Sequence, residues 1–76
     1  MKDLLELIAK NLVDNPDAVV VTETQSDRGT VLELRVAPED MGKVIGKQGR
    51  IAKAIRTVVK AGAIQNDTRV TVEIAQ

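Results

Sequence analysis

Two helical patterns in this chain are separated by only four residues, Gly46-Lys47-Gln48-Gly49, and this spacing restricts the fold strongly. Ahead of the four residues, apolar side chains recur at helical spacing at Met41, Val44 and Ile45. Behind them, apolar side chains share one helical arc at Ile51, Ile55, Val58 and Val59. Glycine has no Cβ, so Gly46 and Gly49 can adopt positive φ and let a second backbone approach closely. We therefore expect two amphipathic helices joined by a tight turn with a glycine at each end.

The tip of this turn is suited to holding an anionic chain. Lys47 and Gln48 carry N–H donors and one positive charge. The N-terminus of the following helix adds free backbone N–H groups and a partial positive charge. Six basic residues and no acidic residue lie between Lys43 and Lys60, whereas residues 1–42 hold four basic and nine acidic residues. Net charge is zero, but this distribution predicts one positive end that attracts phosphate.

The remaining patterns complete a small α/β domain. Helical periodicity spans residues 3–13 and 50–61, and a short helix is expected from Pro38 to Gly46, with Glu39 and Asp40 as its first-turn acids. Strand patterns span 18–25, 30–36 and 68–74. Gly62 is expected to end the last helix, and Gly42 predicts close packing against a neighbour. The fold class expected is α+β, with one domain over 1–76: a three-stranded mixed sheet packed against three helices in α-β-β-α-α-β order.

Residue types that the chain lacks exclude several classes of function. Without Cys or His there are no disulfides, no thiolate chemistry and no neutral-pH imidazole base, and no nucleophile–base pair or metal-ligand spacing is present. We therefore expect no enzyme, cofactor or metal site. Without Phe, Tyr or Trp, bases cannot stack on aromatic rings as they do in several single-strand binders. No apolar run approaches the ~20 residues of a membrane helix and no signal-peptide pattern is present, so a cytoplasmic location is expected.

Residues 36–60, VAPEDMGKVIGKQGRIAKAIRTVVK, resemble the core of a KH domain. The helix and strand placed first are similar to the type II arrangement. The resemblance implies a protein that binds single-stranded RNA, in which the glycine loop clamps the backbone of about four nucleotides and bases lie over an aliphatic groove. The implied RNA-binding residues are Val44, Ile45, Gly46, Lys47, Gln48, Gly49, Arg50, Ile51 and Lys53.

The resemblance also implies a role for each of these residues. Gly46 and Gly49 would let phosphates approach the main chain, Lys47 and Gln48 would donate hydrogen bonds, and Arg50 and Lys53 would contact further phosphates. Val44, Ile45 and Ile51 would form or support the groove floor, with Leu34 and Val36 on its sheet side. Implied partners are RNA, a second copy of the chain in a homodimer, and a larger KH-containing protein in a heterodimer. A role as an RNA chaperone or post-transcriptional regulator with effects on cell shape is implied too.

Two other functions fit the same patterns. Two helices joined by a glycine-containing turn also describe a helix-turn-helix, in which the helix from Arg50 to Lys60 would read duplex DNA. Alternatively, the loop is vestigial and the domain is a protein–protein interaction module that uses an apolar patch or a sheet edge.

Overall fold

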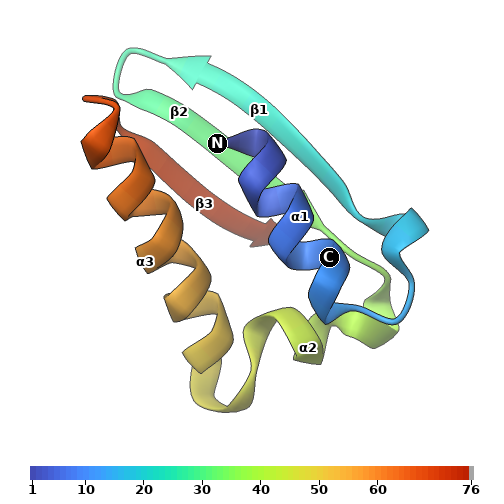
Figure 1. The fold of residues 1–76 in the computed structure, drawn as a ribbon. Coiled ribbons are helices and arrows are strands. Elements are labelled where there is room, and N and C mark those ends of the chain that lie inside the picture. The colour runs from blue at the N-terminus through green and yellow to red at the C-terminus, as the bar shows by residue number, and fades with distance from the viewer. Residues whose placement is uncertain (76) are drawn as a thin grey trace.

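Three α-helices cover one face of a three-stranded sheet in the computed structural model, which describes residues 1–75 (Figure 1). The main elements are α1 (Lys2–Leu12), β1 (Val20–Ser26), β2 (Gly29–Arg35), α2 (Met41–Ile45), α3 (Arg50–Gln65) and β3 (Val70–Ala75). Short 3₁₀ turns lie at 16–18, 38–40 and 47–49. The α+β class and the order of elements predicted from the sequence are thus confirmed.

The sheet order is β1-β2-β3, so β1 and β3 are its two edges. β1 runs antiparallel to β2, with Val21 opposite Leu34, and β2 runs parallel to β3, with Leu32 opposite Val72. The parallel pair is joined through α2 and α3, as a crossover of this length allows. This connection places α3 alongside the β3 edge, while α1 lies over β1 and β2 (Figure 1).

The core lies between the sheet and the three helices. Its fully buried aliphatic side chains come from α1, β2, α2 and α3, and they include Leu5, Leu32, Leu34, Val44 and Val59. In the run Val19-Val20-Val21, the middle valine is exposed and its two neighbours are buried, so strand alternation begins there. None of the helices within residues 1–75 combines the length and the apolar character that a membrane span needs.

Two expectations about glycine were wrong. α3 continues four residues past Ala61, and Gly62 lies inside it with the Met1 side chain packed against its surface. Gly62 therefore makes room for Met1 instead of ending the helix. Gly42 is exposed, and a Cβ built on it would meet nothing within 4 Å. It packs against no neighbour, so close packing does not explain it.

Candidate nucleic-acid interface

The loop between α2 and α3 is a turn with positive φ at three of its four positions. Gly46 has φ 75°, Gln48 has φ 58° and Gly49 has φ 75°. The Gly46 N–H donates to the Gly42 carbonyl at 2.9 Å and closes α2, and the Gly49 N–H donates to the Gly46 carbonyl at 3.2 Å. A residue with a side chain pays a conformational cost at such φ values, so glycine suits both positions. The turn leaves Lys47 and Gln48 exposed at its tip.

The two loop glycines differ in their surroundings. A Cβ on Gly46 would lie 2.5 Å from Cγ1 of Ile51, the second residue of α3. A Cβ on Gly49 would meet nothing within 4 Å. Gly46 therefore lets the loop fold back onto α3, whereas Gly49 leaves one side of the backbone open. An approaching phosphate would find unobstructed main chain at Gly49.

Apart from the two glycines, the sequence-predicted site residues fall into two groups in the structure. Lys47, Gln48, Arg50 and Lys53 are exposed, and Nη2 of Arg50 lies 3.4 Å from Oε1 of Gln48. The three predicted apolar residues differ from one another: Val44 is fully buried, Ile51 is half-buried and Ile45 is 36% exposed. Val44 therefore cannot touch a ligand. We expected it either to form the groove floor or to support it, and as a buried residue it can only support it.

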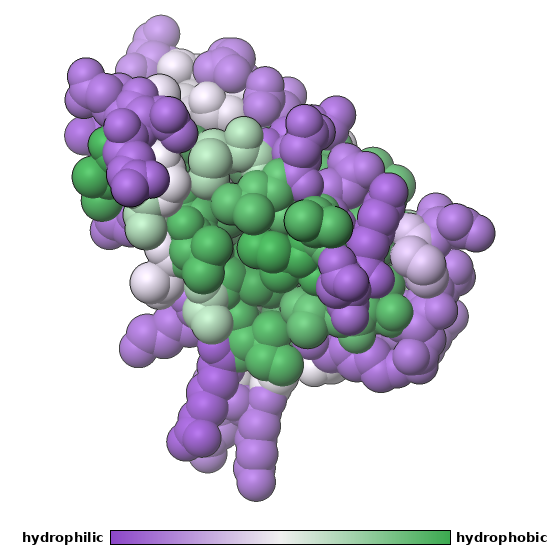
Figure 2. Space-filling view, viewed as in Figure 1, coloured by the Kyte–Doolittle hydropathy of each residue, from purple (hydrophilic) through white to green (hydrophobic). Residues whose placement is uncertain are grey.

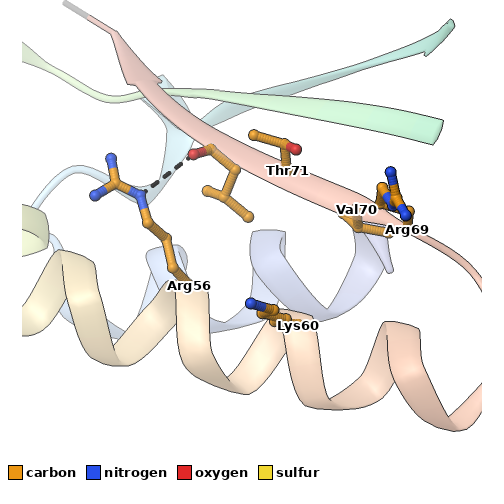
Figure 3. Close-up of a pocket in the computed structure, with 6 residues that line it drawn as sticks. Arg56, Lys60, Arg69, Val70 and Thr71 are labelled. Carbon is orange, nitrogen blue, oxygen red and sulfur yellow. Dashed lines mark hydrogen bonds between the residues drawn. The ribbon is translucent and has the colours of Figure 1, made fainter. Parts of the chain in front are cut away.

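The sheet side of the groove differs from the expectation. Leu34 and Val36 are buried in the core, so neither lines a surface groove. A groove of about 660 Å³ instead runs between α3 and the β3 edge, lined by Arg56, Lys60, Arg69, Val70, Thr71 and Val72 (Figure 3). Its volume falls within the range of about 300–1,000 Å³ typical of ligand pockets. Three of the six lining residues are cationic and none is acidic.

The β3 wall of this groove also presents backbone polar groups. The Arg69 carbonyl accepts a hydrogen bond from the Thr30 N–H at 2.9 Å, which points it toward β2. Because alternate residues of a strand point their polar groups to opposite sides, those of Val70 and Val72 face away from β2. Nε of Arg56 donates to the Val72 carbonyl at 3.3 Å across the groove (Figure 3). The wall therefore offers hydrogen-bonding groups beside the half-buried Val70 side chain.

Sequence reasoning missed all six groove residues, of which Arg56, Lys60 and Arg69 are the cationic ones. Arg56 and Lys60 belong to the basic run, but the pattern alone does not show which basic residues face a strand. Arg69 comes nine residues after that run and reaches the groove because β3 lies on the sheet edge beside α3. The sequence signal that could have pointed to Arg69 is its position as a basic residue directly before the last strand.

The opposite flank of α3 is apolar. A second groove separates it from α1 and is lined by Ile8, Leu12, Arg50, Ile51, Ala54, Ile55 and Val58. Figure 2, viewed as in Figure 1, shows hydrophobic side chains gathered over this helical face and hydrophilic ones around them. α3 thus has a buried face, a basic flank toward β3 and an apolar flank toward α1, and the glycine loop lies at its beginning.

Comparison with known proteins identifies the family of the chain. Residues 2–74 match the family model described as KhpA/KhpB, KH domain. The chain belongs to the KhpA/KhpB family of KH domains. A member from Clostridium acetobutylicum, RNA-binding protein KhpA, is 68% identical over 74 residues, which cover 97% of this chain and 99% of that protein.

More distant KhpA/KhpB relatives also align over nearly their whole length. RNA-binding protein KhpA of Aquifex aeolicus is 53% identical over 76 residues, covering 100% of this chain and 96% of that protein. RNA-binding protein KhpA of Listeria monocytogenes is 50% identical, with both chains fully covered. No solved structure matches the chain.

Proposed function

We propose that residues 1–76 form one KH domain that binds single-stranded RNA, with phosphates at the Gly46–Gly49 loop and bases in the groove between α3 and β3. The observation behind the proposal is that the loop, with its exposed donors, leads directly into the basic flank of α3. The relatives named above as RNA-binding proteins support the same ligand.

The chemistry of each part fits a different part of the ligand. Lys47 and the backbone at Gly49 suit phosphate oxygens, because charge-assisted hydrogen bonds to an anion are stronger than neutral ones. The groove has the half-buried Val70 side chain instead of aromatic rings, and the β3 edge supplies donors and acceptors for base edges. Phosphate contacts supply affinity with little sequence information, so we expect permissive binding.

Charge reversal at the loop tip tests this function. Lys47→Asp combined with Gln48→Asp should weaken binding to a short single-stranded RNA at least tenfold, measured by fluorescence anisotropy. The matched control is Lys2→Asp with Gln25→Asp, which makes the same charge change at exposed positions on α1 and β1. The control should bind nearly as wild type, and circular dichroism should show both variants folded.

The same assay separates the alternatives. Tighter binding to duplex DNA of matched length than to single-stranded RNA would favour the helix-turn-helix interpretation. Unchanged RNA binding in the loop variant would mean that this loop is not the clamp, and absence of any RNA binding would favour an interaction module.

We further propose that the apolar groove between α1 and α3 is a homodimer interface. Apart from Arg50, the residues that line the groove have aliphatic side chains, and Val58 among them is 49% exposed. Burying these side chains against a second copy would add burial that a chain this small lacks. Val58→Asp should then leave the domain folded and shift it to monomer, measured by light scattering. Mixing a KhpB-like protein with wild type and with Val58→Asp would show whether a heterodimer uses the same face.

RNA as the ligand also suggests a cellular role. We propose that the protein acts in the cytoplasm as an RNA chaperone or post-transcriptional regulator, with cell shape among the processes affected. Crosslinking in cells followed by sequencing of the bound RNA would test this, and recovery of no RNA above that of the loop variant would contradict it.

A further inference from the structure

Asp40 is the buried charged residue of the domain. Its side chain is 1% exposed, and no other charged side chain within residues 1–75 is buried. Asp40 comes directly before α2, where an acid often caps its own helix, yet its carboxylate makes no capping hydrogen bond there. The sequence-based assignment of Asp40 as a first-turn acid therefore describes its position but misses its contacts.

The carboxylate binds a distant part of the chain instead. Oδ1 accepts a hydrogen bond from the Asp14 N–H at 3.2 Å, and Oδ2 accepts one from the Asn15 N–H at 3.1 Å. Lys43 extends the cluster, because its Nζ lies 3.6 Å from Oδ1 of Asp40 and also pairs with the Asp14 carboxylate. The hydrogen bond to Asp14 raises the pKa of Lys43 above its usual value. A buried carboxylate needs such partners, and here both oxygens have them.

These contacts fix the helix that carries the loop. α2 has only five residues, and its single buried side chain is Val44. Asp40 holds the start of α2 to the segment between α1 and β1, and Ile45 at its end leads directly into Gly46. α2 also packs against α3 and α1, but Asp40 ties its start to the Asp14-Asn15 backbone, so we expect a change at Asp40 to shift the loop.

We propose that Asp40 is a positioning residue for the RNA clamp: it anchors α2 to the Asp14-Asn15 backbone and thereby holds the Gly46–Gly49 loop in its binding geometry. This inference rests on the proposed function of the loop. It predicts that a variant at Asp40 binds RNA more weakly than wild type even when it remains folded, so that lost stability does not account for the weaker binding.

The variant Asp40→Asn separates positioning from charge. Asparagine has nearly the same shape, but its amide nitrogen cannot accept from a backbone N–H, so one of the two anchoring bonds is lost. The substitution also removes one negative charge, which by itself would strengthen attraction to RNA. A weakened affinity therefore cannot come from the change in net charge.

Val21→Ala is the matched control, because it removes buried volume from β1 and destabilises the core at a position outside α2 and the Gly46–Gly49 loop. Wild type and both variants are compared in sucrose, which favours the compact state and keeps a destabilised variant folded. One readout is the Kd for a short single-stranded RNA. The other, measured without RNA, is hydrogen exchange at the Gly46 and Gly49 amides, which donate to the Gly42 and Gly46 carbonyls.

We expect Asp40→Asn to raise the Kd about five- to tenfold and to speed exchange at both amides, with Val21→Ala within twofold of wild type in each. Asp40→Asn matching Val21→Ala in either measurement would overturn the positioning role. Failure of wild type to bind RNA would instead refute the proposed function, and exchange alone would then decide whether Asp40 holds the loop.

Discussion

Gly42, Gly46 and Gly49 lie within eight residues of one another, yet each meets a different environment. Gly42 is helical and open to solvent, Gly49 is open but has φ 75°, and Gly46 has φ 75° and faces Ile51. Substitution at Gly42 therefore tests helix propensity, at Gly49 it tests backbone strain, and at Gly46 it tests backbone strain together with steric overlap. Alanine is the suitable probe, because it adds only a Cβ.

Alanine substitutions should change the free energy of unfolding differently at the three positions. Gly42→Ala should stabilise by about 0.5–1 kcal/mol, since glycine disfavours a helix interior. Gly49→Ala should destabilise by about 1–2 kcal/mol through its left-handed φ. Gly46→Ala should cost about 2–4 kcal/mol, because φ 75° with ψ 175° is a backbone conformation essentially restricted to glycine and a Cβ there would also overlap Ile51.

Urea unfolding of the three variants measures these effects, with Gly42→Ala as the internal control. Equal losses for Gly46→Ala and Gly49→Ala would contradict the contact between Gly46 and Ile51. Destabilisation by Gly42→Ala would show that this position is tighter than the structure has it.

At the scale of elements, periodicity predicted the parts that depend on local burial. The alternation of Leu32, Leu34 and Val36 gave the buried face of β2, and the helical arcs gave α1 and α3. The end of α3 could not be predicted from neighbouring residues, because Gly62 is compatible with a helix end and also with a helix interior that the Met1 side chain covers. Asp40 likewise shows no local sign that its partners lie 25 and 26 residues earlier.

For the candidate site too, only the parts that depend on adjacent residues could be predicted from the sequence. The loop and the exposed donors follow from adjacent residues, whereas the groove depends on which strand forms the sheet edge. That order is a property of the whole sheet, since β3 pairs with β2 only after a crossover through two helices. Arg69 and the β3 backbone therefore joined the site only once the topology was known.

The basic flank of α3 leads to a prediction about Arg56. Arg56→Gln should weaken RNA binding about five- to tenfold and, if Arg56 contacts a phosphate, reduce the steepness of the salt dependence by about 0.7 for a single strand. Arg35→Gln is the matched control, because Arg35 is exposed on β2 and pairs with Glu33, outside the groove. A Kd titration in several salt concentrations measures both effects. An equal loss in the two variants would assign the effect to net charge.

At the scale of the whole molecule, charge is segregated although the total is zero. The basic run from Lys43 to Lys60 and the acidic excess in residues 1–42 separate the two signs along the chain, although Lys43 itself pairs with Asp14 and Asp40. If about three phosphates are neutralised, log K should fall with log salt at a slope of about −2 for a single strand. Titration from low to high salt tests this, and a flat dependence would exclude a phosphate clamp.

The two flanks of α3 also predict how binding depends on RNA length. The basic flank faces β3 and the apolar flank faces α1, so a second copy on the apolar groove would leave the α3–β3 groove of each copy open and would lie beside Arg50 and Ile51 at the start of α3. The longest dimension of the domain is 34 Å, so two loops in a dimer lie at most about two such lengths apart. A long strand could then reach both loops, and its second contact would be intramolecular.

Wild type and Val58→Asp should therefore bind a four-nucleotide RNA equally and differ on a strand several times longer. On the long strand we expect wild type to bind at least tenfold more tightly, because avidity is lost with the dimer. Anisotropy at protein concentrations where light scattering shows wild type dimeric is the measurement. An equal gain with length in both proteins would place the additional contacts within one domain, and a loss on the four-nucleotide RNA would measure the effect of the added negative charge on binding to one domain.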